Sequence, residues 1–476
     1  MATGRLNLVS TAPESLVAFS LVIIAYFLLW NVSQIAMSPL SATVLFRDQR
    51  RHTPRALALT SGVAVPPLVS IVVPACNEEL TIVESIRALL ALDYEPREVV
   101  IVNDGSTDDT LPLLRRTFHL VPAPLAFVQP LRAERVRAVY RSVSEPDLVV
   151  VDKENGGSKA DACNAGINAA SGVLVLIIDA DTVLETDSLT RAVLPFLEDP
   201  ATVAVGANIG IANGCQIEHG RIVDVALPRN WFARFQVVEY MRSFLLFRLA
   251  CASLNAVVLI SGAFGLFRRD AVIAVGGYDP TSIGEDMDLT IRLQRHFRQR
   301  REPARITFDP NPLCWTQAPE DWGSLQSQRA RWRRGLLQTL WRYRRMIGNP
   351  RFGVVGLGVL PYITFFEGLG PLLEGAGLLV TSVAAALGYL DWKYFGMMIA
   401  VSAFLGVSVT LFAVLMSDVT MQRYAQGHDL ALLVAIAILE SFGYRQINSA
   451  WGWLGTMQAM SGRSGWGTMK RRAFRT

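Results

Sequence analysis

The chain has 476 residues, of which 51% are hydrophobic and 18% charged, and its mean hydropathy is +0.31. It is too apolar for an ordinary soluble enzyme but charged enough to include a globular domain, so we expect membrane spans joined to a water-soluble domain. The formal net charge of +4 lacks the strongly basic character of nucleic-acid-binding proteins, so we expect no nucleic acid partner. Five scattered cysteines show no zinc or disulfide spacing, which fits a reduced cytoplasmic setting.

The first apolar segment, Leu16–Met37, is long enough to cross a bilayer, which takes roughly 20 residues. It lacks the basic leader and small-residue cleavage pattern of a removed signal peptide, so we predict a retained transmembrane anchor over residues 1–45. Arg47, Arg50 and Arg51 follow the segment closely, whereas only Arg5 precedes it. The positive-inside rule therefore predicts an external amino terminus and a cytoplasmic domain.

The next region, residues 46–350, reads as one globular domain in which strand and helix patterns alternate. Short apolar runs predict buried strands, and apolar residues three or four apart predict helices. The strands are expected over 68–74, 98–103 and 173–178, and the helices over 79–92, 110–118, 160–170, 287–297 and 325–345. This alternation predicts an α/β fold with a parallel, nucleotide-binding sheet of the Rossmann-like kind.

Carboxylates stand where predicted strands end. Asp104 follows the second strand, and Asp179 and Asp181 follow the apolar run that begins at Val173. Open α/β sheets present ligand-binding groups at the carboxyl ends of their strands, and two carboxylates there suit a divalent cation such as Mg²⁺. The alternative is that aspartates merely form turns and cap helices, and for Asp108 we favour that interpretation.

The segment Lys153–Lys159 combines a glycine turn with two cations immediately before a predicted helix. Free backbone N–H groups at a helix start and a nearby lysine favour an anion, so this turn is a candidate phosphate or sugar site. Its spacing is not that of a Walker loop, and ordinary solvated lysines are the alternative.

Two further patterns lie downstream. Glu285 and Asp286 open the helix predicted over 287–297, where a negative charge is stabilised, so capping alone could explain them. Gln328, Arg331 and Trp332 occur at positions i, i+3 and i+4 of a predicted helix and therefore share one face that suits a diphosphate and a sugar. We expect the neighbouring arginines to form a membrane-facing cationic collar: Arg329, Arg333, Arg334, Arg342, Arg344 and Arg345.

Residues 351–476 are expected to hold transmembrane and interfacial helices and a basic tail. Phe352–Leu390 reads as an interfacial piece plus one span, and Tyr394–Met416 as a second span. The tail Gly462–Thr476 carries five basic residues, which favours a cytoplasmic end and therefore an even number of crossings. We favour two crossings, with Leu430–Met460 partly interfacial; four remain open if Phe352–Leu390 forms a hairpin.

Six ordered motifs together resemble the family 2 inverting glycosyltransferases, and the last resembles the membrane-embedded subgroup that makes cellulose, chitin, hyaluronan and poly-N-acetylglucosamine. The motifs are Pro74…Asn77-Glu78, Asn103-Asp104-Gly105-Ser106, Lys159-Ala160…Asn164, Asp179-Ala180-Asp181, Gly284-Glu285-Asp286 and Gln328-Arg329-Ala330-Arg331-Trp332. The segment Ser261–Arg269 is also similar to the acceptor-side region of the poly-N-acetylglucosamine synthase type. Cys76 stands where an aromatic is common, and Gly284 where Thr is frequent. The resemblance implies a GT-A nucleotide-sugar-binding domain flanked by transmembrane helices in the inner or plasma membrane.

The resemblance also implies a role for each residue. The donor UDP-sugar would contact Pro74, Glu78, Asp104, Lys159 and Asp179, and Asp181 would bind Mg²⁺ or Mn²⁺ on its diphosphate. Asp286 would be the catalytic base of a single inverting displacement, and Gln328, Arg331, Trp332 and Glu285 would lie on the acceptor and diphosphate side, although Glu285 could be structural. The product would be a β-linked glycan exported through the membrane segments, and membrane lipids and an accessory export subunit are further partners that the resemblance allows.

Three alternatives stay open beside the polysaccharide synthase. The nearest is a non-processive enzyme that moves one sugar onto a lipid, as ceramide glucosyltransferases do. An inactive nucleotide-sugar-binding scaffold is disfavoured because every expected carboxylate is present, and a transporter would leave the α/β domain unexplained. The sugar itself is not encoded by these motifs; N-acetylglucosamine is favoured by the acceptor-side resemblance alone.

Overall fold

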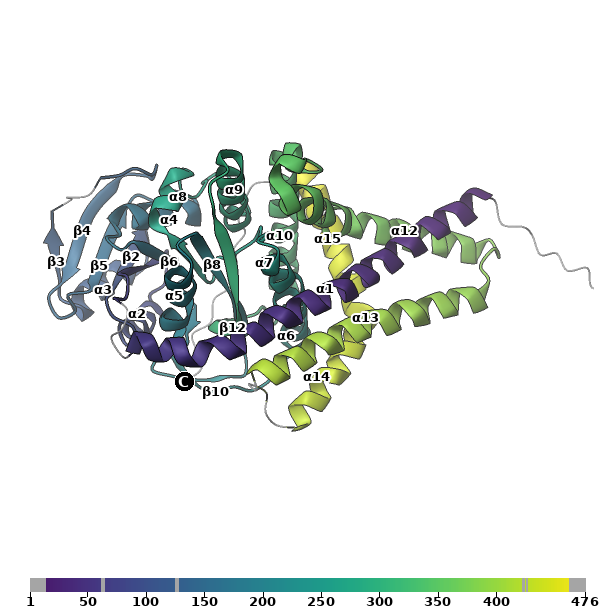
Figure 1. Cartoon of the computed structure of the whole chain (residues 1–476), viewed down its shortest axis with the longest axis horizontal. Coiled ribbons are helices and arrows are strands. Elements are labelled where there is room, and N and C mark those ends of the chain that lie inside the picture. Colours follow the sequence, from purple (N-terminus) through teal and green to yellow (C-terminus); the bar gives the residue numbers. More distant parts are fainter. Residues whose placement is uncertain (1–13, 61–64, 125–127, 422–423, 425–426, 462–476) are drawn as a thin grey trace, which may run out of the picture.

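The computed structural model describes residues 14–60, 65–124, 128–421, 424 and 427–461. An α/β domain stands at one end, and long helices extend from it as an arm (Figure 1). The predicted α/β fold is confirmed: one sheet of ten strands has the order β3-β4-β5-β2-β1-β6-β11-β8-β12-β7. Its strands are β1 (Val69–Ala75), β2 (Arg97–Asp104), β3 (Leu120–Ala123), β4 (Val136–Ser142), β5 (Leu148–Lys153), β6 (Leu174–Ile177), β7 (Val183–Leu184), β8 (Thr202–Ile211), β11 (Gly265–Arg268) and β12 (Arg305–Thr316), while β9 (Gln216–Glu218) and β10 (Arg221–Asp224) form a separate hairpin.

Helices cover the sheet and connect its strands. They are α2 (Ile82–Leu90), α3 (Thr110–Thr117), α4 (Lys159–Ala169), α5 (Ser188–Glu198), α6 (Trp231–Arg242), α7 (Leu249–Ser253), α8 (Arg269–Ala274), α9 (Glu285–Arg300) and α10 (Trp322–Arg342), and a π-helical segment, Ser243–Arg248, joins α6 to α7. Five helices expected from the sequence are therefore present as α2, α3, α4, α9 and α10. Their ends differ from the predicted ends by up to three residues.

The central strands β5, β2, β1 and β6 run parallel to one another. Strand β1 is buried on both faces, with side chains such as Ile71 and Val72 fully inaccessible, which is why its sequence is a continuous apolar run rather than an alternating one. Burial of each such side chain contributes about 1.5 to 3 kcal/mol. Gly166 of α4 lets the helix approach β1 closely, because a Cβ there would lie 2.3 Å from Val72 Cγ1.

The carboxyl edge of these parallel strands collects the polar groups. Asp104 ends β2, Lys153 ends β5, and Asp179 follows β6 by two residues. Strand β11 enters antiparallel to β6, with Gly265 opposite Ile177. The segment that precedes β11 therefore lies at the same edge, although it is far from the other groups in the sequence.

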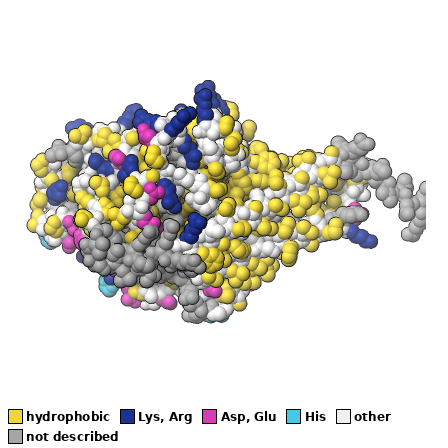
Figure 2. Space-filling view, in the orientation of Figure 1, with side chains coloured by type: hydrophobic (Ala, Val, Ile, Leu, Met, Phe, Trp, Pro, Cys, Tyr) yellow, Lys and Arg dark blue, Asp and Glu magenta, His cyan; other side chains and the backbone are white. Residues whose placement is uncertain are grey.

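Within the described residues, four helical stretches are long and apolar enough to cross a membrane by length and composition: Ala18–Arg47, Val355–Ala386, Phe395–Val419 and Gly427–Met460. In Figure 1, α1 (Glu14–Thr60), α12 (Gly370–Ala386) and α13 (Trp392–Met421) form the arm, and in Figure 2 hydrophobic side chains cover it while charged ones gather on the α/β domain. The fourth stretch is broken, because Phe442 and Gly443 are non-helical between α14 (Gly427–Leu439) and α15 (Arg445–Met460). Both halves are shorter than a comfortable crossing and lie at the junction with the domain (Figure 1).

The expected arginine collar is wrong for three of its six members, Arg329, Arg333 and Arg334, which are not exposed. Arg329 forms two hydrogen bonds with the Glu239 carboxylate, at 2.6 and 2.8 Å, and Arg342 contacts Asp279 and Asp288. Arg333 is buried and donates to Thr456 and to the backbone of the segment at Glu367, and Arg334 is buried too. Arg342, Arg344 and Arg345 are exposed as expected, although Arg342 is also paired with carboxylates. Helix periodicity places these arginines around α10 but cannot reveal the carboxylates that other elements bring to them.

Two other expectations concern the ends of the chain, namely the limit of the amino-terminal anchor and the basic tail. The limit drawn at residue 45 falls inside α1, which continues to Thr60 and packs against the domain, where Ser41 Oγ donates to Leu246 O at 2.7 Å. The basic tail Gly462–Thr476 lies outside the described residues, as does Arg5.

Candidate active site

The loops that follow β1 and β2 are bound to each other. Asn77 has a left-handed backbone (φ 58°), its N–H donates to Ser106 Oγ at 3.0 Å, and its side-chain oxygen accepts from Thr107 N–H at 2.8 Å. The N–H of Glu78 donates to Thr110 Oγ1 at 2.9 Å, and the Glu78 side chain is buried. These bonds hold Glu78 beside the turn that follows Asp104, and Pro74 pairs with Val102, two residues before Asp104.

Asp104 is a buried carboxylate with fixed partners. Its Oδ1 accepts from Lys153 Nζ at 2.5 Å and from Gly156 N–H at 3.0 Å. Lys153 is fully buried between this carboxylate and that of Asp161, at 2.6 Å. Lys153 is therefore neither a solvated lysine nor a free anion-binding group, because two carboxylates already neutralise its charge. The glycine turn closes onto Asp104 itself.

A chain of contacts joins the aspartates after β6 to the start of α9. Lys159 Nζ lies 2.5 Å from Asp179 Oδ1 and donates to Gly262 O at 2.9 Å. On the other side of the same residue, Gly262 N–H donates to Asp286 Oδ2 at 3.3 Å. Although burial would lower the pKa of Lys159, the neighbouring Asp179 carboxylate raises it above its ordinary value, so the lysine stays charged. Asp179, Lys159 and Asp286 are thus brought together across Gly262.

Asp181 differs from Asp179 in having no lysine partner among the contacts that the structure shows. Burial, together with the charge of Asp179, raises the pKa of Asp181 to about 6. A carboxylate that is costly to ionise favours a bound cation, and Mg²⁺ commonly uses one or two carboxylates plus substrate phosphates. No group of three or more His, Cys, Asp or Glu side chains in the described residues could hold a metal ion by itself, so a cation here would also need ligands from the donor. The oxygen-only donor set fits Mg²⁺ or Mn²⁺.

Glu285 and Asp286 occupy the first turn of α9. Burial raises the pKa of Asp286, while the N–H of Met287 and the charges of Lys159 and Arg248 lower it. Burial and the charge of Asp286 raise the pKa of Glu285 to about 7. Capping does not account for both residues: Asp286 accepts from its neighbour Met287 N–H at 2.7 Å but also from Gly262, which belongs to a distant segment.

The motif on α10 faces the start of α9. Gln328, Arg331 and Trp332 precede Gly335 by seven, four and three residues, so all four share one helix face. Gly335 packs directly on Gly284, where a Cβ on Gly335 would lie 3.0 Å from Gly284 N. Trp332 is 42% exposed, and the side-chain oxygen of Gln328 is buried without a hydrogen-bond partner among the described residues. The structure thus places this motif on the side of α10 that packs on the residue before Glu285 and Asp286.

Sequence reasoning missed two residues of this site. Gly262 lies in the segment that we noted as acceptor-side, but its position between Lys159 and Asp286 depends on how β11 pairs with β6. Arg248 gave no signal because it lies in an apolar stretch. Its guanidinium lies 4.0 Å from the centre of the Phe244 ring, and its Nη1 is buried without a partner in the described part of the chain.

Comparison with known proteins gives consistent matches. Residues 66–335 match the family described as Glycosyltransferase like family 2. The poly-β-1,6-N-acetyl-D-glucosamine synthase of Staphylococcus aureus (strain COL) is 32% identical over 269 residues, which cover 56% of this chain and 54% of the relative; the synthase of Staphylococcus epidermidis is 28% identical over 277 residues, covering 57% and 56%. The chain therefore spans about half the length of the curated relatives it matches.

Among solved structures, the mannosyltransferase PcManGT from Pyrobaculum calidifontis in complex with GDP-Man and Mn²⁺ is similar, with a TM-score of 0.51 and 18% identity. The match covers 88% of this chain and 99% of that chain. At this identity the likeness concerns the fold alone.

Proposed function

The chain belongs to glycosyltransferase-like family 2 and is a glycosyltransferase, and from this premise we propose that it transfers N-acetylglucosamine from UDP-N-acetylglucosamine to the end of a growing β-linked glycan. The choice of sugar is supported by the names of the staphylococcal relatives. The glycan acceptor is supported by the same names.

The donor would lie along the carboxyl edge of β1, β2 and β6. Pro74, Glu78 and Asp104 line the place of the uridine, because the loops after β1 and β2 enclose that corner of the sheet. Lys159 and Asp179 hold the nucleotide sugar, with the lysine charge directed between Asp179 and Gly262. Asp181 holds Mg²⁺ or Mn²⁺, and when bound the cation supplies charge neutralisation for the departing diphosphate.

Asp286 is the base in this proposal. Its carboxylate accepts the proton of the acceptor hydroxyl as that oxygen attacks the anomeric carbon, and the bond to UDP breaks on the opposite face. One displacement inverts the configuration, so an α-linked donor gives a β-linked product. Burial raises the pKa of Asp286, which makes it a better proton acceptor than an exposed aspartate. Glu285 beside it is partly neutral near pH 7, so we assign it a supporting role.

The acceptor would lie between α9 and α10. Trp332 offers a partly exposed indole for a sugar face, Gln328 a buried oxygen that a sugar hydroxyl could satisfy, and Arg331 a charge for the diphosphate. The chain that leads into α12 meets α10 at this place, since Arg333 donates to the backbone oxygens of Glu367 and Gly368 directly before α12. We therefore propose an integral protein of the inner or plasma membrane with its catalytic domain in the cytoplasm and two carboxyl-terminal crossings, α12 and α13, through which the glycan leaves.

One observation carries the proposal. The contacts from Asp179 through Lys159 and Gly262 to Asp286 join the proposed donor-binding group to the proposed base, which lie 107 residues apart in the sequence. A purely structural reason for this polar chain at the ligand-binding edge of the sheet is weak, because Asp179 and Lys159 are only partly buried.

The test uses the full-length protein in lipid nanodiscs with labelled UDP-N-acetylglucosamine, UDP-glucose or UDP-glucuronate, with and without Mn²⁺. We expect UDP release to be highest with UDP-N-acetylglucosamine and the label to enter high-mass, glycanase-sensitive material. A single labelled glycolipid would favour the lipid glycosyltransferase instead, and full activity of Asp286→Asn would contradict the assignment of the base. Absence of UDP release with every donor would refute the proposal.

A further inference from the structure

One face of helix α10 forms hydrogen bonds and ion pairs with residues 279–288, which include the first turn of α9. Gln338 accepts from Ile283 N–H at 2.8 Å and donates to Thr281 O at 3.1 Å. One turn further on, Arg342 Nη1 donates to Asp279 at 2.5 Å and to Asp288 at 3.0 Å. Together with the Gly335 contact, these bonds lie on the same stripe of α10 as Arg331.

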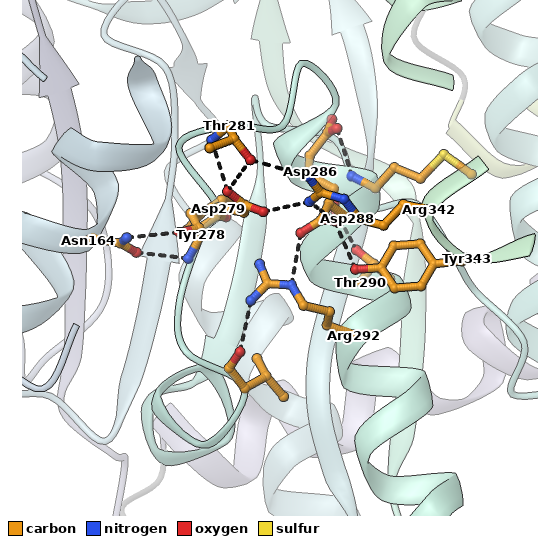
Figure 3. A network of polar contacts seen from close by, with 12 residues as sticks. Asn164, Tyr278, Asp279, Thr281, Asp286, Asp288, Thr290, Arg292, Arg342 and Tyr343 are labelled. Carbon is orange, nitrogen blue, oxygen red and sulfur yellow. Dashed lines mark hydrogen bonds and ion pairs between the residues drawn. The ribbon is translucent and has the colours of Figure 1, made fainter. Parts of the chain in front are cut away.

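Asp288 is at the centre of these polar contacts between α9 and α10 (Figure 3). Its side chain is fully inaccessible, and it accepts from Arg292 Nε at 2.8 Å, from Arg342 Nη1 at 3.0 Å and from Tyr343 OH at 2.8 Å. The first donor belongs to α9 itself and the other two to α10 and the residue that follows it. Burying a carboxylate costs free energy unless several well-placed donors form hydrogen bonds with it. The positions of Asp288 and of its three donors therefore depend on one another.

We propose that Asp288 is a positioning residue for sugar transfer: by holding Arg342 and Tyr343 it sets the separation between Asp286 on α9 and the Arg331–Trp332 face of α10. This inference rests on the proposed function. Asp288 does not touch the substrate; it is two residues beyond Asp286 on the same helix. Displacement of catalytic groups by about 1 Å can cost about a hundredfold in rate, which is why such a remote contact matters.

The alternative is that Asp288 only keeps the domain folded. In that case its loss lowers the amount of active enzyme but leaves each active molecule unchanged. The two roles separate in the ratio of sugar transferred to glycan over sugar lost to water, because the acceptor needs α10 in place and water does not.

The decisive variant is Asp288→Asn, and the matched control is Asp309→Asn. Asp309 is also buried and accepts from an arginine, Arg191 at 3.3 Å, but it lies on β12 and its partner on α5. In Asp288→Asn we expect kcat to fall about 10- to 100-fold with a donor KM within about threefold of wild type, and the ratio of transfer to hydrolysis to fall at least about fivefold. The control Asp309→Asn should keep the wild-type kcat, donor KM and ratio of transfer to hydrolysis. An unchanged ratio in Asp288→Asn would overturn the inference.

Two additions keep the test decisive. Tyr343→Phe removes one hydroxyl and no charge, so it can be measured even if Asp288→Asn does not fold. In Tyr343→Phe we expect smaller decreases in kcat and in the ratio of transfer to hydrolysis. Spin labels at the exposed positions Arg300 and Trp341, in a background with Cys76→Ser and Cys215→Ser because Cys215 is only half-buried, report the distance between α9 and α10 without any activity. We expect a broader distance distribution in Asp288→Asn than in the control. Equal distributions would contradict the positioning role, whereas an inactive wild-type protein would contradict only the proposed function.

Discussion

Gly284 and Gly335 bring α9 and α10 into backbone contact, and the contact is unequal for the two residues. A Cβ on Gly335 would lie 3.0 Å from Gly284 N and 3.2 Å from Gly284 Cα, closer than side chains normally pack against a rigid backbone. A Cβ on Gly284 would lie at 3.4 Å or more from Gly335, which is ordinary van der Waals contact. This asymmetry makes one of the two glycines replaceable.

We expect Gly335→Ala to push α10 away from the start of α9. Overpacking of this kind costs about 1 to 3 kcal/mol of stability, and displacement of the Arg331–Trp332 face should lower glycan transfer at least about tenfold. Gly284→Ala is the matched control and should retain near-normal stability and transfer. The measurements are thermal unfolding in nanodiscs and incorporation of labelled sugar; equal effects of the two substitutions would contradict the packing shown here.

Cys76 offers a test of the donor site that does not depend on catalysis. It is the exposed cysteine, lies directly after β1, and receives a weak hydrogen bond from Asn155 at 3.6 Å. Cys163, Cys251 and Cys314 are buried, and burial raises the pKa of each thiol, so they should react slowly. We expect one maleimide adduct to form first, at Cys76, and UDP binding to weaken at least about tenfold.

UDP should in turn protect Cys76 from alkylation, as measured by intact mass and peptide mapping. Cys76→Ser is the control and should bind UDP normally with or without maleimide. Alkylation of Cys76 at the same rate with and without saturating UDP would place the nucleotide elsewhere.

The sequence predicts the elements of this site better than their contacts. Strands β1 and β2 and helix α9 are recognisable because their apolar periodicity is local, and Asp104 and Asp179 follow directly from the strand ends. The partners of Lys153 and Arg342 are not recognisable, because Asp104, Asp161, Asp279 and Asp288 come from other elements. Strand β11 is four residues long and pairs antiparallel inside a mainly parallel region, so no local pattern reveals that Gly262 reaches Asp286.

Substitution of each of the two aspartates after β6 should reduce the affinity for a different ligand. Asp181→Asn removes the proposed cation ligand, so we expect Mn²⁺ affinity measured by electron paramagnetic resonance in the presence of UDP to fall at least about tenfold, and transfer to fall at least about a hundredfold. Asp179→Asn leaves Asp181 in place but removes the partner of Lys159. It should weaken binding of UDP-N-acetylglucosamine while Mn²⁺ still binds with UDP.

Asp187→Asn is the control for both substitutions, because the Asp187 side chain is about half exposed and the residue directly precedes α5. Its Mn²⁺ and donor affinities should match those of the wild type. If Asp179→Asn and Asp181→Asn lose Mn²⁺ affinity equally, the separate roles assigned to them are wrong.

The pH dependence of transfer should report Asp286. A base must be ionised, and burial raises the pKa of Asp286, so activity should be lost as the pH falls through a value above that of an exposed aspartate, about 3.9. The charge of Arg248 opposes this rise. Arg248→Met should therefore move the acid limb of kcat/KM to higher pH, whereas Arg248→Lys, which keeps the charge, should leave it near the wild-type position.

Burial and the charge of Asp286 raise the pKa of Glu285 as well, to about 7, so the two carboxylates must be told apart. In Glu285→Gln the acid limb should persist because Asp286 still has to lose its proton, whereas Asp286→Asn should leave almost no transfer at any pH. Loss of the limb in an active Glu285→Gln enzyme would instead identify Glu285 as the base. A limb that stays in place in Arg248→Met would show that the buried guanidinium does not act on the group that titrates.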